Sequence, residues 1–271
     1  MAAPATIGRI ALAVFRESVR DRVLYNLVGF ALLVIGASFL LGQLTAGQDV
    51  KIIKDLGLAA MAIFGVFIAI FIGIGLVSKE VERRSIYSLL AKPVRRTELV
   101  LGKYAGLALT IAINLAVMVV VWYLVLAYLS WVETEAFKRS WEAPATDPRM
   151  LVAVYLIFVQ LLLVIAIALF FSTFSSPMLS AAFTFALYVA GHFSADLRNF
   201  DAVVGDSPVR YLTTALYYVL PNMALFDVKS AVVHAQPVPV GYVALATLYA
   251  GTYVAALLVA AVIIFSRRDF K

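Results

Sequence analysis

The stretch KEVERRSIYSLLAKPVRRTELVLGK, residues Lys79–Lys103, interrupts an otherwise apolar chain and decides how the rest can fold. It carries seven basic residues and stands between two long runs without any charged side chain. Within it, Ile86, Leu89 and Leu90 recur at helical spacing, and Lys92-Pro93 follows, which is how a short helix ends. The stretch therefore predicts a short amphipathic helix on one face of a membrane bundle.

The composition on either side of this stretch is that of a membrane protein. Of 271 residues, 63% are hydrophobic and 14% are charged, whereas a soluble domain carries roughly 25% charged residues. Six runs contain no Asp, Glu, Lys or Arg, and at about 1.5 Å per residue they match the roughly 30 Å hydrocarbon core. The sequence therefore predicts an all-α, polytopic bundle, one transmembrane domain over residues 1–271, with spans at about 24–41, 56–77, 104–128, 151–171, 178–192 and 240–265.

The distribution of basic residues predicts the orientation of these spans. With six spans, the two termini and the Lys79–Lys103 loop share one side, which is net positive, while the segments on the other side are net negative. This is the positive-inside pattern, so both termini and the loop are expected in the cytoplasm. It also accounts for the basic pI of about 9.5, and no nucleic-acid partner is predicted.

Two segments outside the spans and one pair of glycines within a span predict further features of the fold. Residues 7–22 place apolar and basic side chains on separate faces, which predicts a helix lying along the inner leaflet. Residues 208–222 are too short to span and rich in tyrosine, so they predict a re-entrant or an interfacial element on the outside. Gly65 and Gly73 share one helix face, which favours close packing either within the chain or with a second copy.

Catalytic chemistry finds little support in the sequence. There is no P-loop and no HExxH motif, and the two histidines, His192 and His234, are expected on the outside, with no metal site. The charge-free spans argue against a proton- or sodium-coupled carrier. Asn114 and Gln160 lie near the middle of their spans, where buried amides either line a pathway or form interhelical hydrogen bonds.

This arrangement resembles the permease subunits of ABC-2 type exporters, which have an interfacial N-terminal helix, six spans and a coupling helix between the second and third. The loop of that family carries acidic residues, a Leu-Leu pair, a proline, basic residues and Gly-Lys. Here the matching positions are Glu80, Glu82, Arg84-Ser85, Leu89-Leu90, Pro93, Arg95-Arg96 and Gly102-Lys103. Arg84 departs from the glycine that is usual there. Leu220-Pro221-Asn222 also resembles the outer re-entrant region of the family.

The resemblance implies a permease, not catalytic alone, in a bacterial or archaeal cytoplasmic membrane, with two copies of an ABC ATPase and a second permease copy as partners. The chain itself would bind no cofactor, because ATP and Mg would sit on the ATPase. An extracytoplasmic partner is a further expectation. The helix Ser85–Ala91 would dock on the ATPase through apolar anchors within a charged rim. The coupling residues implied are Glu80, Glu82, Arg83, Arg84, Ser85, Ile86, Leu89, Leu90, Pro93, Arg95, Arg96 and Lys103.

Two other function classes remain open at this stage. One is a non-transporting scaffold or immunity-type subunit on the same bundle, and the other is an intramembrane enzyme that modifies lipids. The enzyme would need carboxylates or histidines near an interface within the spans, and the apolar runs contain no carboxylate. ATP-driven transport in vesicles would separate the exporter from the scaffold. The sequence does not specify the substrate.

Overall fold

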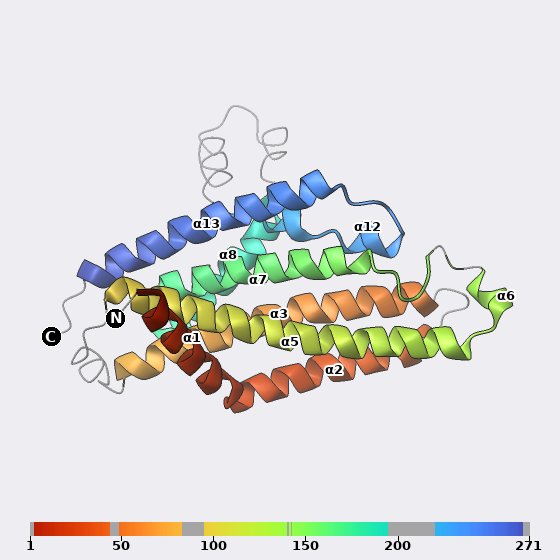
Figure 1. Cartoon of the computed structure of the whole chain (residues 1–271), viewed down its shortest axis with the longest axis horizontal. Helices are drawn as coiled ribbons and strands as arrows, with labels where there is room; N and C mark the ends of the chain where they lie inside the picture. The colour runs from red at the N-terminus through yellow and green to blue at the C-terminus, as the bar shows by residue number, and fades with distance from the viewer. Residues whose placement is uncertain are drawn as a thin grey trace.

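The computed structural model describes residues 3–43, 49–82, 95–139, 141, 143–194 and 220–267, and every regular element in these ranges is helical. Figure 1 shows the long helices side by side in one elongated bundle. The predicted all-α, polytopic bundle is therefore confirmed. The elements are α1 (Ala3–Val19), α2 (Arg22–Gln43), α3 (Asp49–Glu82), α5 (Arg96–Val132), α6 (Glu135–Lys138), α7 (Met150–Ser172), α8 (Pro177–His192), the 3-10 helix η1 (Met223–Phe226), α12 (Lys229–Val233) and α13 (Val240–Arg267).

Five of the described helices, namely α2, α3, α5, α7 and α13, are long and apolar enough to cross a membrane. The fifth predicted span, 178–192, forms α8, whose 16 residues rise only about 24 Å, against a core of roughly 30 Å. A Cβ added at Gly191, near the end of α8, would lie 2.6 Å from both the Pro221 carbonyl oxygen and a Met223 side-chain atom. The returning chain, η1 and then α12, packs on α7 at this point.

Two helices extend well beyond the apolar runs that predicted them. Helix α3 has 34 residues and α5 has 37, because the helical pattern continues into the polar flanks. Lys54 illustrates this, since it stands four residues before Leu58 and seven before Met61, on the same buried face. We call the end of the bundle that holds Glu82, Arg95 and Arg267 the loop end, and the opposite end the far end.

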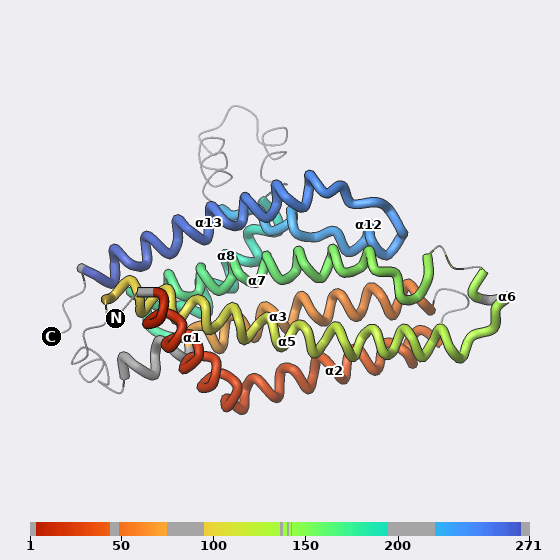
Figure 2. The backbone as a smooth tube through the Cα atoms, viewed as in Figure 1, coloured from red at the N-terminus to blue at the C-terminus, as the bar shows by residue number. Residues whose placement is uncertain are grey.

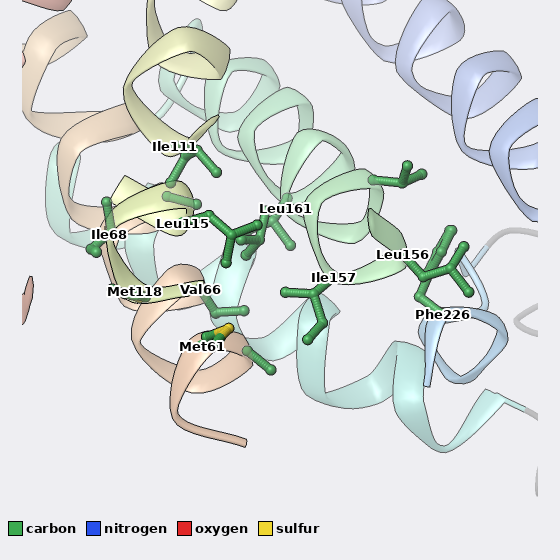
Figure 3. Close-up of a cluster of buried hydrophobic side chains, with 14 of the residues drawn as sticks. Met61, Val66, Ile68, Ile111, Leu115, Met118, Leu156, Ile157, Leu161 and Phe226 are labelled. Atoms are coloured by element: carbon green, nitrogen blue, oxygen red, sulfur yellow. The ribbon is translucent and has the colours of Figure 1, made fainter. Parts of the chain in front are cut away.

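Helices α3 and α7 form the centre of the bundle. In the most apolar 18-residue segment of each helix, 72% of the residues are buried in α3 and in α7, against 22% in α2 and 17% in α13. Helix α5 covers one side of this pair, and α2 and α13 lie outside it. Figure 3 shows the side chains that meet at the centre from α3, α5, α7 and η1: Met61, Val66, Ile68, Ile111, Leu115, Met118, Leu156, Ile157, Leu161 and Phe226.

Glycines set the distance between α3 and α7. A Cβ added at Gly65 would lie 2.6 Å from a Leu161 methyl carbon, and one added at Gly73 would lie 3.4 Å from Ala168 Cβ. The shared face of Gly65 and Gly73 is therefore used for packing within the chain, as the intrachain alternative predicted.

Helix α1 crosses the first turns of α5, and two further glycines allow this contact. A Cβ at Gly102 would lie 2.6 Å from Ile10 Cβ, and one at Gly106 would lie 2.6 Å from the Ala11 carbonyl oxygen. Val14 is buried in the contact, whereas Arg9 and Arg16 are exposed. The predicted N-terminal amphipathic helix is thus present as Ala3–Val19. Figure 2 shows that the start of α1, the start of α5 and the end of α13 lie at one end of the bundle.

Candidate functional site

The predicted docking segment connects two of the longest helices. Several of the predicted docking residues lie outside the described residues, as does most of 208–222. They are Arg83, Arg84, Ser85, Ile86, Leu89, Leu90 and Pro93. Glu80 and Glu82 belong to the last turns of α3, where the backbone alone is described. The structure therefore places the two attachment points of the segment, at Glu82 and Arg95, and leaves its docking role a prediction.

Arg95 and Arg96 open α5 at the loop end. The backbone N–H of Arg95 donates to Glu98 Oε2 at 3.2 Å, so the glutamate satisfies a donor at the helix N-terminus. Arg96 reaches across the bundle, where its Nη1 donates to the carbonyl oxygens of Phe265 at 2.9 Å and Ser266 at 2.6 Å. A guanidinium is well matched to the partial negative charge at the C-terminus of α13. Arg96 therefore ties the start of α5 to the end of α13.

Lys103, the last predicted docking residue, is buried rather than exposed. It lies beside a cavity of about 20 Å³ that is also lined by Ser172, at the end of α7, and by Phe265, near the end of α13. Gly102, its neighbour, lies under α1. Lys103 therefore belongs to the interior of the loop end, where α5, α7 and α13 meet.

The two predicted pathway amides have different partners. Asn114 is half-buried, and its Nδ2 donates to the Thr110 carbonyl oxygen of the same helix at 2.7 Å. Gln160 is buried in α7, and its Nε2 lies 3.3 Å from Nε2 of His192 in α8. The structure thus gives Gln160 an interhelical contact and Asn114 an intrahelical one.

His192 was expected on the outer surface, but it is half-buried against α7. Its Nδ1 lies 3.0 Å from the Tyr188 carbonyl oxygen, which can only accept, so we assign the ring proton to Nδ1. Nε2 then accepts from the Gln160 amide. Helix α8 ends beside Gln160, near the middle of α7. This polar pair therefore marks the level at which α8 ends, and η1 packs against α7 and α8.

The residues that sequence reasoning missed lie at the far end. Lys54 is 1% exposed, and its Nζ donates to the Pro144 carbonyl oxygen at 2.9 Å, with the Asp147 carboxylate as the opposite charge acting on it. Burying an ammonium group is costly unless it is paired and hydrogen-bonded, and here the chain supplies both. The shared helix face of Lys54 with Leu58 and Met61 was the signal that could have revealed this site.

Two aromatic residues of α5 complete the far-end contacts. Trp122 is fully buried, and its Nε1 donates to the Ile53 carbonyl oxygen at 3.0 Å. Tyr123 donates through its hydroxyl to the Asp147 carbonyl oxygen, also at 3.0 Å. These two bonds fasten α5 to α3 and to the loop before α7. We call Lys54, Trp122, Tyr123, Pro144 and Asp147 the far-end clamp.

Among the described residues, no three His, Asp or Glu side chains gather closely enough to hold a metal ion. His234 is exposed directly after α12, and its Nδ1 bonds to the Ser230 carbonyl oxygen at 2.9 Å. The polar groups described so far position helices relative to one another. They are suited to mechanical or binding roles.

Comparison with known proteins identifies one family. A family model described as "ABC-2 family transporter protein" matches residues 9–270, which is nearly the whole chain. No curated protein matches the chain.

Proposed function

The chain belongs to the ABC-2 family of transporter proteins, and from this premise we propose that it is the membrane permease subunit of an ATP-driven exporter whose ATPase is a separate chain. ATP and Mg would be held by that ATPase, and this chain would carry the substrate across the membrane. In support of a membrane subunit, five of the described helices are long and apolar enough to span a membrane.

One observation supports the coupling step above all others. The segment 83–94 contains Ser85–Ala91, the docking helix that the family resemblance implies, and it connects the loop ends of α3 and α5, of which α3 is at the centre of the bundle. Packed helices move as rigid bodies, because closely packed interiors deform little. A displacement of this segment by the ATPase would therefore be passed directly to the core of the transporter.

At the loop end, helices α1, α5 and α13 would move as one unit together with the docking segment. Helix α1 is fitted onto α5 at Gly102 and Gly106, and Arg96 holds the end of α13. Any movement at the start of α5 would thus carry α1 and α13 with it. The far-end clamp would hold the opposite end of α5 to α3.

For the substrate pathway we propose the Gln160–His192 pair, with Asn114 as a second candidate. The pair lies at the break between α8 and η1, where two polar side chains face each other in an apolar interior. Asn114 is half-buried and bonds only to its own helix turn among the contacts described for it, so its side chain could turn toward a substrate.

The assembly we propose contains two copies of this chain and two ATPase subunits, in a bacterial or archaeal cytoplasmic membrane with both termini in the cytoplasm. A homodimer would give the two ATPase subunits equivalent docking sites, in keeping with the two-fold symmetry usual for such assemblies. An extracytoplasmic partner at the far end is a further part of the proposal.

Purification of the tagged chain from its native membranes tests the coupling proposal. We expect an ATPase with a Gly-x-x-x-x-Gly-Lys-Ser/Thr sequence to co-purify with it and to hydrolyse ATP. The double substitution Leu89→Asp and Leu90→Asp should abolish the co-purification, because charged side chains cannot fill an apolar cleft without losing hydration.

The matched control carries the same two added charges at the other end of the molecule. Thr134→Asp and Gln236→Asp both alter exposed far-end positions, and this variant should retain the ATPase. Equal retention by both double variants would refute docking through 83–94. ATP-driven transport in vesicles then separates an exporter from a scaffold, since a scaffold would hold the ATPase without moving any substrate.

A further inference from the structure

A groove opens on the side of the bundle between the first turns of α5 and the second half of α13. Its volume is about 480 Å³. Both helices belong to the set long and apolar enough to span a membrane, so the groove faces the bilayer. The residues that define its length are Thr97 and Leu101 of α5 and Gly251, Ala255, Val259 and Ile263 of α13.

The length of the groove matches one leaflet of a membrane. From Gly251 to Ile263 the helix rises about 18 Å, and half of the hydrocarbon core is about 15 Å. Ile263 lies near the loop end and Gly251 near the middle of α13. The groove therefore runs from the membrane surface at the loop end to the midplane.

The lining of the groove suits a hydrocarbon chain. Of the described residues that line it, Thr97 alone has a polar side chain, and it stands at the loop end. The remaining lining residues are glycine or carry aliphatic side chains, which offer no hydrogen-bonding group to a polar ligand.

Basic side chains stand at the loop end of the groove. Arg95 is exposed and precedes Thr97 by two residues. Arg96 is held at the carbonyl end of α13, which offsets part of its charge, and Glu98 accepts from the backbone N–H of Arg95. Among the described residues at this end, the exposed Arg95 guanidinium is thus the group best placed to meet a phosphate of a lipid headgroup.

We propose that this groove holds one acyl chain of an anionic phospholipid, whose headgroup is recognised by Arg95. The lipid would fill the space between α5 and α13 and would couple the two helices in addition to Arg96. This site is separate from the Gln160–His192 pair, and its occupancy does not depend on the ATPase or on transport.

Native mass spectrometry of the purified chain, supplied with phosphatidylglycerol or phosphatidylcholine in detergent, tests the proposal. We expect one phosphatidylglycerol per chain to be retained in preference to phosphatidylcholine. Gly251→Leu should remove this lipid, because a Cβ at Gly251 meets no atom of the chain within 4 Å and the new side chain would project into the groove. The second filling variant, Ala255→Leu, should have the same effect.

Gly241→Leu is the matched control, because Gly241 is also on α13, outside the groove, with no atom of the chain within 4 Å of an added Cβ. It should retain the lipid. Arg95→Gln should keep the acyl chain but lower the preference for phosphatidylglycerol by about fivefold, the effect of one basic residue at a membrane surface. An unchanged preference in Arg95→Gln would overturn the headgroup assignment.

The groove assignment itself has two contrary outcomes. Full lipid retention in folded Gly251→Leu and Ala255→Leu proteins would mean that the lipid binds elsewhere. A change from dimer to monomer in these variants, with the lipid count per chain unaltered, would mean that a second copy covers the groove. Since no ATPase is present in the experiment, either failure leaves the proposed permease function untouched.

Discussion

The two ends of α5 are held in different ways. At the far end a buried tryptophan and a tyrosine of α5 bond to α3 and to the loop before α7, and a buried lysine of α3 bonds to the same loop. At the loop end, α5 is held by glycine-mediated packing of α1 and by one arginine on the carbonyl end of α13. The far end is thus fastened by buried polar bonds, and the loop end by contacts that can shift together. We expect stability to depend on the first and motion on the second.

The largest effect on stability is expected from the far-end clamp. Trp122→Ala should lower the free energy of unfolding by about 4 kcal/mol, because it removes a large buried ring and the bond to the Ile53 carbonyl. Trp131→Ala is the control, since Trp131 is 81% exposed. Thermal unfolding in detergent measures both. Equal melting temperatures for the two variants would show that the clamp does not hold the far end.

Loss of the buried lysine should come next. Lys54→Met keeps the apolar stem but leaves the Pro144 carbonyl without the ammonium donor, at a cost of about 2 kcal/mol. The control is Lys138→Met, which breaks a surface ion pair with Glu135 and should cost about 0.5 kcal/mol or less. A stability of Lys54→Met equal to that of the control would contradict the buried contact.

A smaller loss is expected where α1 meets α5. Gly106→Ala places a Cβ 2.6 Å from the Ala11 carbonyl oxygen, and overpacking should outweigh the helix-propensity gain by about 1 kcal/mol. Gly36→Ala on α2 is the matched control, because a Cβ there meets no atom within 4 Å, and it should be neutral or stabilising. The same unfolding experiment would detect the difference in sign, and a stabilised Gly106→Ala would refute close α1–α5 packing.

The smallest effect on stability is expected for Arg96→Leu, about 0.5 kcal/mol, because its bonds to the end of α13 are partly exposed. Its effect on ATP-driven transport in vesicles should be larger than its effect on melting. A variant that transports normally would show that α5 and α13 need not move together.

The helical bundle could be read from the sequence because apolar runs and their flanking charges are local features. The apolar runs cover only part of α3 and α5, since the runs end where polar residues begin, although Lys54 continues the buried face. The close approach of Met223 to Gly191 and the pairing of Gln160 with His192 each join segments that are distant in the sequence. Such contacts depend on tertiary packing, which spacing along the chain does not encode.

The predicted docking positions show the same difference between local sequence features and tertiary packing. Lys103 was assigned to the docking set from the Gly-Lys of the family resemblance, and in the structure it is buried at the loop end, where α7 and α13 meet α5. Trp122 and Tyr123 lie in a run whose composition predicts only a span, and the structure gives both residues hydrogen-bond partners inside the bundle. Local composition located the long helices along the chain, and three-dimensional packing decided which side chains face inward.

The most direct test is a pair of distance measurements on the complex with its ATPase in lipid vesicles. The chain contains no cysteine, so two spin labels can be placed at exposed positions without removing native thiols. One pair joins Thr97 and Phe174 at the loop end, and the other joins Thr134 and Gln236 at the far end. On addition of ATP we predict a changed distance for the loop-end pair and an unchanged one for the far-end pair. A far-end change with a fixed loop end would contradict the account.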